Sequence, residues 1–173
     1  MTALSSPIRQ QVAWISNLYG VFSTIFAAGL FLAYYGKLNK LVSIATITFF
    51  LMCFVSLIGY SLFPLSAEGY LGTFTDVMHM IVTASVVLLT IATLSLFSIG
   101  LFKSGEFKVL MLSSIICLFM MMTGSLMTAF VPANIFGLAE RVSLYSLQVY
   151  FVVLALTLFQ TPETDVKKSL PVS

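Results

Sequence analysis

The sequence predicts an all-α integral membrane protein: a helical bundle of five transmembrane helices, with the N-terminus outside and the C-terminus inside. Two observations predict this class. The 173-residue chain is 60% hydrophobic and only 8% charged, whereas about a quarter of the residues in soluble domains are charged. Its apolar residues also gather in five long runs, each near the roughly 20 residues of helix that cross a hydrocarbon core of about 30 Å.

Each of the five runs is bounded by proline, glycine, glutamine or charged residues. Apolar side chains occupy every face of the runs, and lipid requires a segment to pair its own backbone groups, so helices are favoured over a barrel. We expect residues 1–11 to form an external tail, residues 12–159 one transmembrane domain, and residues 160–173 a flexible cytoplasmic tail. In chain order the runs are Val12–Tyr35, Leu41–Phe63, Val77–Phe102, Val109–Val131 and Val142–Phe159.

The orientation follows from the distribution of positive charge, because lysine and arginine near span ends resist translocation. The two short links, 36–40 and 103–108, share one side of the membrane with the C-terminal tail. The longer links, 64–76 and 132–141, lie on the other side with Arg9 and Arg141, and we expect that side to be external. Six lysines mark the cytoplasmic side: Lys37, Lys40, Lys103, Lys108, Lys167 and Lys168. The net charge of +2 gives no indication of a nucleic-acid partner.

A polar cluster is predicted at the outer mouth of the bundle, from Glu68, Asp76, His79, Glu140 and Arg141. Asp76 and His79 are three residues apart, so they share a face if both lie in the first turn of the third helix. The plainer interpretation is structural. Thr73 and Asp76 have the spacing of a capping box, Glu140 can likewise cap the fifth helix, and Arg141 can pair with either acid or reach the headgroups.

The sharper interpretation is a reactive or binding site. His79 would exchange a proton or hold a metal with carboxylates, while Arg141 would meet an anionic headgroup or substrate. A single histidine excludes a three-imidazole zinc site and a bis-histidine haem. One histidine with two or three carboxylates stays open as a metal site, but the structural interpretation is favoured, so we predict no metal and no cofactor.

Several short motifs resemble one membrane family. Phe63-Pro64 is followed by a polar link and then by Asp76 and His79, while the segment 137–141 reads Gly-Leu-Ala-Glu-Arg at the start of the last helix. These features are similar to the bacterial and archaeal family known as domain of unknown function 998, grouped with the Frag1 and DRAM type of membrane protein. The resemblance implies six helices, of which this chain would lack the first. It implies no established activity.

The functional prediction is a non-enzymatic, multi-pass protein of the inner cell membrane. Asp76, His79, Glu140 and Arg141 would stabilise helix ends and bind a lipid headgroup or a partner subunit, with membrane lipids and further helices as neighbours in a homo- or hetero-oligomer. Two alternatives remain open. One is a membrane-embedded hydrolase or lipid-modifying enzyme that uses His79 with Asp76 or Glu140, and the other is a small-molecule permease.

Overall fold

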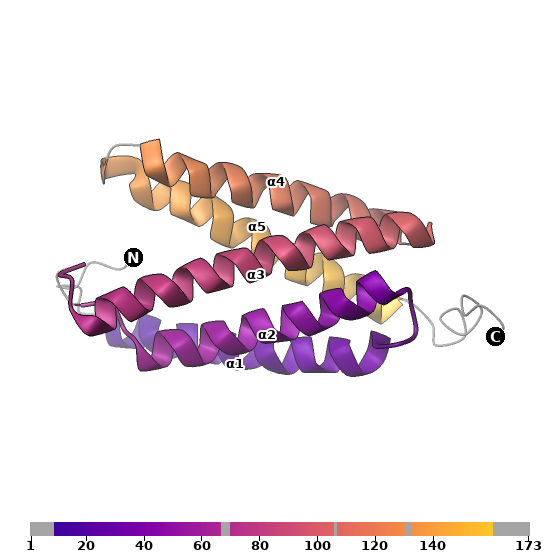
Figure 1. Ribbon diagram of the computed structural model, residues 1–173, viewed down its shortest axis with the longest axis horizontal. Helices are drawn as coiled ribbons and strands as arrows, with labels where there is room; N and C mark the ends of the chain where they lie inside the picture. Colours follow the sequence, from indigo (N-terminus) through magenta and orange to yellow (C-terminus); the bar gives the residue numbers. More distant parts are fainter. Residues whose placement is uncertain (1–8, 67–69, 106, 131–132, 161–173) are drawn as a thin grey trace. The chain divides into compact units, whose positions relative to one another are not determined.

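The structure is a computed structural model that describes residues 9–66, 70–105, 107–130 and 133–160. These ranges contain five α-helices and no strand, so the all-α class is confirmed (Figure 1). The expected tails 1–8 and 161–173 lie outside the described residues. The helices are α1 (Arg9–Tyr34), α2 (Lys40–Leu62), α3 (Phe74–Ser104), α4 (Lys108–Phe130) and α5 (Ala133–Gln160).

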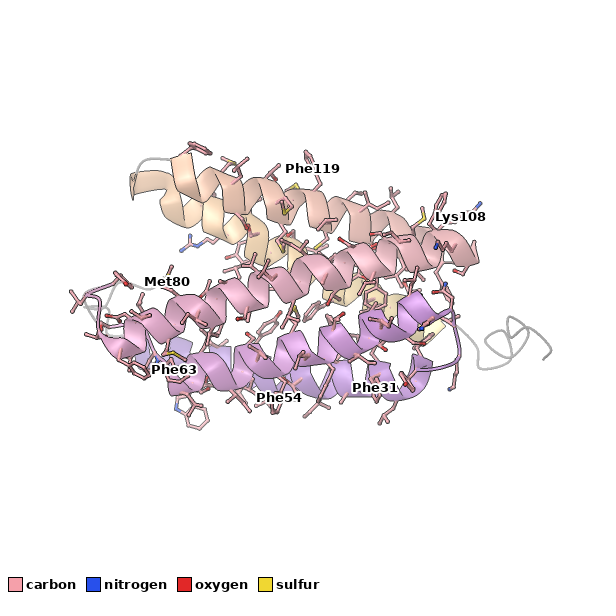
Figure 2. The ribbon with its side chains drawn as sticks, in the orientation of Figure 1. Phe31, Phe54, Phe63, Met80, Lys108 and Phe119 are labelled. Carbon is pink, nitrogen blue, oxygen red and sulfur yellow. The ribbon has the colours of Figure 1, made fainter. Side chains whose placement is uncertain are left out.

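Four of these helices, α1 to α4, are long and apolar enough to cross a membrane. Many of their large apolar side chains are exposed, as Figure 2 shows for Phe54 and Phe119. Such surfaces suit lipid rather than water. The described apolar stretch of α5, Arg141–Thr157, is shorter. The chain thus has the helices of a membrane protein, while the fifth span and the orientation stay predictions.

The start of α5 differs from the expected one. The sequence places a link over residues 132–141, but α5 begins at Ala133 rather than at Val142. Pro132 and Gly137 suggest a link, yet the intervening and following residues include alanine, leucine, glutamate and arginine, which are strong helix formers. One glycine costs a helix only about 1 kcal/mol relative to alanine. The helix therefore continues through Gly137.

Local polar groups explain where α2 begins. Asn39 precedes the helix, and its Oδ1 accepts a hydrogen bond of 3.1 Å from the backbone N–H of Val42, which is the bond that an N-cap residue makes. Gly36 ends the preceding turn at φ +75°, and its N–H donates to Ser43 Oγ at 3.1 Å. These contacts join the short link to the first turn of α2.

The described chain divides into two compact units, and α2 and α3 contribute to both. The first unit contains α1, residues 46–62 of α2 and residues 74–93 of α3. Its buried residues include Ala27, Phe49 and Met52. Phe26 meets Phe49 edge-on, with 6.4 Å between ring centroids. A single domain over residues 12–159 stays a prediction.

The second unit contains residues 36–45, the end of α3 from Leu94, α4 and α5. Its buried residues combine large apolar side chains such as Phe97 with small polar ones such as Ser114. The Ser114 hydroxyl lies 2.9 Å from that of Ser98, and Ser143 Oγ donates to the carbonyl oxygen of Met121 at 3.2 Å. Hydroxyls that bond across helices are a usual means of association in lipid.

Tyr150 offers a test of this packing. The residue is 1% exposed, its ring lies 6.4 Å from that of Phe97, and within the described part of the chain its hydroxyl has no hydrogen-bond partner. A buried, unpaired hydroxyl costs stability, so Tyr150→Phe should raise the free energy of unfolding by about 1 kcal/mol. Thermal melts of the purified protein measure this change.

Tyr60→Phe is the matched control, because the Tyr60 hydroxyl donates to Thr83 Oγ1 at 3.2 Å. The same loss of one oxygen atom should lower stability at Tyr60 and raise it at Tyr150. Equal destabilisation by both variants would show that the Tyr150 hydroxyl is bonded after all.

Candidate functional site

The first turn of α3 is closed by a capping box. The N–H of Asp76 donates to Thr73 Oγ1 at 3.3 Å, and the N–H of Thr73 donates back to Asp76 Oδ2 at 3.2 Å. Thr73 precedes the helix and Asp76 is the acidic residue of its first turn. This reciprocal pair satisfies two backbone donors that the helix itself leaves unpaired. The capping role predicted from the Thr-x-x-acid spacing is confirmed.

The carboxylate of Asp76 also holds the link that precedes the helix. Asp76 Oδ1 accepts the N–H of Ser66 at 2.8 Å, and Oδ2 accepts the N–H of Leu71 at 3.0 Å. Together with Thr73, three backbone donors from one link converge on one side chain. Asp76 therefore ties the described link residues Ser66, Leu71 and Thr73 to the first turn of α3.

The environment of Asp76 explains how an acid tolerates this position. Asp76 is fully buried, at 0% exposure, and a buried carboxylate needs hydrogen bonds to replace its water. The three backbone donors supply them, and the positive end of the α3 dipole adds favourable electrostatics. Beside this centre, Phe63 and Phe74 meet edge-on, with ring centroids 6.3 Å apart. The two ends of the link are thus held together by polar and aromatic contacts.

His79 lies one turn further along α3 and is half-buried. Its Nδ1 is 2.8 Å from the carbonyl oxygen of Phe63. A carbonyl only accepts hydrogen bonds, so this contact requires the proton on Nδ1 and leaves Nε2 as an acceptor in the neutral ring. The ring also packs against Tyr60, with 5.0 Å between centroids. His79 therefore ties the C-terminal end of α2 to α3.

Asp76 and His79 are near each other on α3 but have separate partners. Among the described residues, no hydrogen bond or ion pair joins the Asp76 carboxylate to the His79 ring. An acid–base dyad requires the carboxylate to orient the imidazole. In this structure the backbone carbonyl of Phe63 orients it instead, and Asp76 is committed to the link.

Glu140 and Arg141 lie in the second unit, whereas Asp76 and His79 lie in the first. The expected cap on the fifth helix is wrong, because α5 starts at Ala133 and its first turn contains no acid. Glu140 instead follows about two turns of helix. Arg141 is exposed. The clustering of all four residues stays a prediction, and Glu68 lies outside the described residues.

The link also presents apolar residues that sequence reasoning missed. Tyr70, Leu71 and Phe74 are 60%, 59% and 73% exposed. They flank Gly72, whose φ of +77° suits glycine far better than other residues. The signal in the sequence was the presence of three large apolar residues in a link otherwise read as polar. The fixed backbone around Asp76 thus carries an exposed apolar surface, which we call the link surface (Tyr70, Leu71 and Phe74).

Comparison with known proteins places the chain in a family. The model of a family described as "Protein of unknown function (DUF998)" matches residues 9–157, which include α1 to α4 and most of α5. No curated protein and no solved structure matches the chain. The family resemblance drawn from the motifs is confirmed, while the Frag1 and DRAM grouping and the missing first helix stay predictions.

Proposed function

We propose, from the premise that this chain belongs to the DUF998 family of proteins of unknown function, that it is a non-enzymatic, multi-pass protein of the inner cell membrane. In this proposal the link between α2 and α3 binds a partner subunit. The single observation that carries the proposal is the set of hydrogen bonds from three backbone N–H groups of the link to the Asp76 carboxylate. These bonds organise the backbone of the link and leave the carboxylate little freedom to react.

The rigid backbone supports binding rather than catalysis. A general acid or base must reach a substrate proton, whereas the Asp76 carboxylate is buried and engaged by Ser66, Leu71 and Thr73. A preformed surface binds more tightly because less conformational entropy is lost on association. Asp76 provides such preorganisation for the link surface.

The chemistry of the link surface favours a protein partner over lipid alone. Tyrosine and other aromatic residues contribute strongly at the centres of protein interfaces. Fluid acyl chains adapt to any shape, so a fixed backbone adds little to lipid contact. A protein partner with a complementary surface does benefit from it. Tyr70, Leu71 and Phe74 are the residues expected to make this contact.

The location is inferred from charge. In the predicted topology six lysines lie on the side of the short links and C-terminal tail, and two arginines on the other, and this charge bias supports an external position for the link surface in an inner membrane. In the same proposal Arg141 and Glu140 remain candidates for binding a headgroup or partner near that side. His79 has a structural role in this proposal, because its Nδ1 bonds to the carbonyl oxygen of Phe63 at the end of α2.

Site-specific photocrosslinking in cells tests the proposal. A photoreactive residue at Phe74 should yield a discrete protein adduct, identifiable by mass spectrometry and reproduced with the two purified proteins. Tyr70→Ser, which leaves the contacts of Asp76 intact, should reduce the yield about tenfold, in the range of an interface anchor worth more than 1 kcal/mol.

A photoreactive residue at Phe119, exposed on α4, is the control, and its adducts should not respond to Tyr70→Ser. If Phe74 gives only lipid adducts, or if its protein adduct is unaffected by Tyr70→Ser, the link surface is not a partner site.

A further inference from the structure

Four exposed lysines lie in the second unit: one in the link before α2, one at the start of α2, one at the end of α3 and one at the start of α4. The stretches 36–45 and 94–108 contain one acid, Glu106, which lies outside the described residues. None of the four lysines forms an ion pair with a described residue. We call this group the basic patch (Lys37, Lys40, Lys103 and Lys108).

A hydrogen bond from a side chain to the backbone brings the start of α2 to the end of α3. Asn39 Nδ2 donates to the carbonyl oxygen of Gly100 at 2.6 Å. A Cβ at Gly100 would lie 3.1 Å from the backbone nitrogen of Val42, so the backbones of α2 and α3 approach closely at this glycine. Lys40 follows Asn39 directly, and Lys103 lies three residues after Gly100, on the same side of α3. These two ammonium groups therefore extend from adjoining helix ends.

The third helix end, the start of α4 at Lys108, follows the end of α3 at Ser104 after only a few residues. Gly105 has a φ of +70°, and its N–H donates to the carbonyl oxygen of Leu101 at 3.2 Å, which closes the end of α3. Phe107 has a φ of 54°, which is unusual for a bulky residue. Its carbonyl oxygen accepts the N–H of Met111 at 2.9 Å and so starts α4. Figure 2 shows Lys108 at that start.

Large apolar side chains stand next to two of these lysines. Phe102 is 73% exposed and precedes Lys103, while Val109 is 71% exposed and follows Lys108. The positive ends of the α2 and α4 dipoles lie at the same helix ends. Positive charge bordered by exposed apolar surface matches a molecule with an anionic head and an apolar tail.

We infer that the basic patch binds the phosphate headgroup of an anionic phospholipid, with the acyl chain against Phe102 and Val109. Each juxtamembrane lysine raises the affinity for anionic lipid about fivefold. The contact between Asn39 and Gly100 brings the start of α2, with Lys40, to the end of α3, which carries Lys103. The inference is independent of the link surface, which lies in the first unit.

Lipid titration of the purified full chain in an uncharged detergent tests the inference, with the melting temperature as the readout. Phosphatidylglycerol should raise the melting temperature, and phosphatidylcholine should not. Lys40→Gln combined with Lys103→Gln should weaken the phosphatidylglycerol response about tenfold or more. Lys40→Arg with Lys103→Arg should retain it, because the charge is kept.

Lys167→Gln combined with Lys168→Gln is the matched control, since it removes the same charge from the C-terminal tail and should leave the response unchanged. Inorganic phosphate is a further arm of the titration. The inference is overturned if phosphatidylglycerol has no effect on the wild type, if the glutamine pair responds like the wild type, if the tail control loses the response equally, or if inorganic phosphate reproduces it.

Discussion

Replacing Asp76 by alanine should lower the melting temperature of the purified protein by several degrees, more than any other single substitution in the first turn of α3. The change removes the acceptor for the N–H groups of Ser66, Leu71 and Thr73 at once. Buried donors that lose their acceptor retain the full cost of desolvation. Asp76→Asn should have a smaller effect, because one amide oxygen still accepts.

Amide hydrogen exchange gives the more specific readout. In the alanine variant the amides of Ser66, Leu71 and Thr73 should exchange faster, while amides in the middle of α3 should keep their protection. Thr75→Ala is the control, because Thr75 is exposed and, among the described residues, its hydroxyl bonds to Thr73 Oγ1 alone. If Asp76→Ala melts like Thr75→Ala, the carboxylate does not hold the link.

Gly100→Ala should have the second large effect. Its new Cβ would lie 2.8 Å from Val42 Cγ2 and 3.2 Å from Asn39 Oδ1, in addition to its approach to the Val42 backbone. The backbone contact gives the site little room to adjust. The expected loss is about 1–3 kcal/mol, the usual range for overpacking, measured by thermal melts in detergent.

Two other helical glycines serve as controls for this prediction. Gly29 is also helical, but a Cβ there would meet nothing within 4 Å, so Gly29→Ala should be neutral or stabilising. At Gly59 a Cβ would meet the Val82 side chain, and Val82→Ala should therefore recover part of the loss caused by Gly59→Ala. Equal melting temperatures for Gly100→Ala and Gly29→Ala would contradict the close contact of α2 and α3.

Hydropathy and flanking charges predicted the first four helices to within a few residues. Lys40, Lys103 and Lys108 lie at helix ends because an ammonium group is costly in hydrocarbon. The predicted start of α5, at Val142, was wrong, because the residues before it also form a helix. Gly137 weakens a helix without preventing one, and the charged residues Glu140 and Arg141 are themselves good helix formers. Composition locates a span better than it locates the end of the helix that contains it.

Only those contacts of the candidate site that join residues close together in the sequence could be predicted. The capping box of Thr73 and Asp76 follows from a fixed spacing. The bonds from Ser66 and Leu71 depend on the path of the link, which no periodicity specifies. Asn39 has the residue type of an N-cap, but its second bond, to Gly100, joins residues far apart in the chain.

The donors that meet Asp76 belong to the main chain, so their side chains are not required for the contact. Any amino acid except proline supplies the same N–H at positions 66 and 71. Evolution can therefore exchange Leu71 and its neighbour Tyr70 while a single aspartate preserves the loop's geometry. Homologues are therefore expected to vary in the side chains at positions 70 and 71 while they keep the backbone contacts of the aspartate.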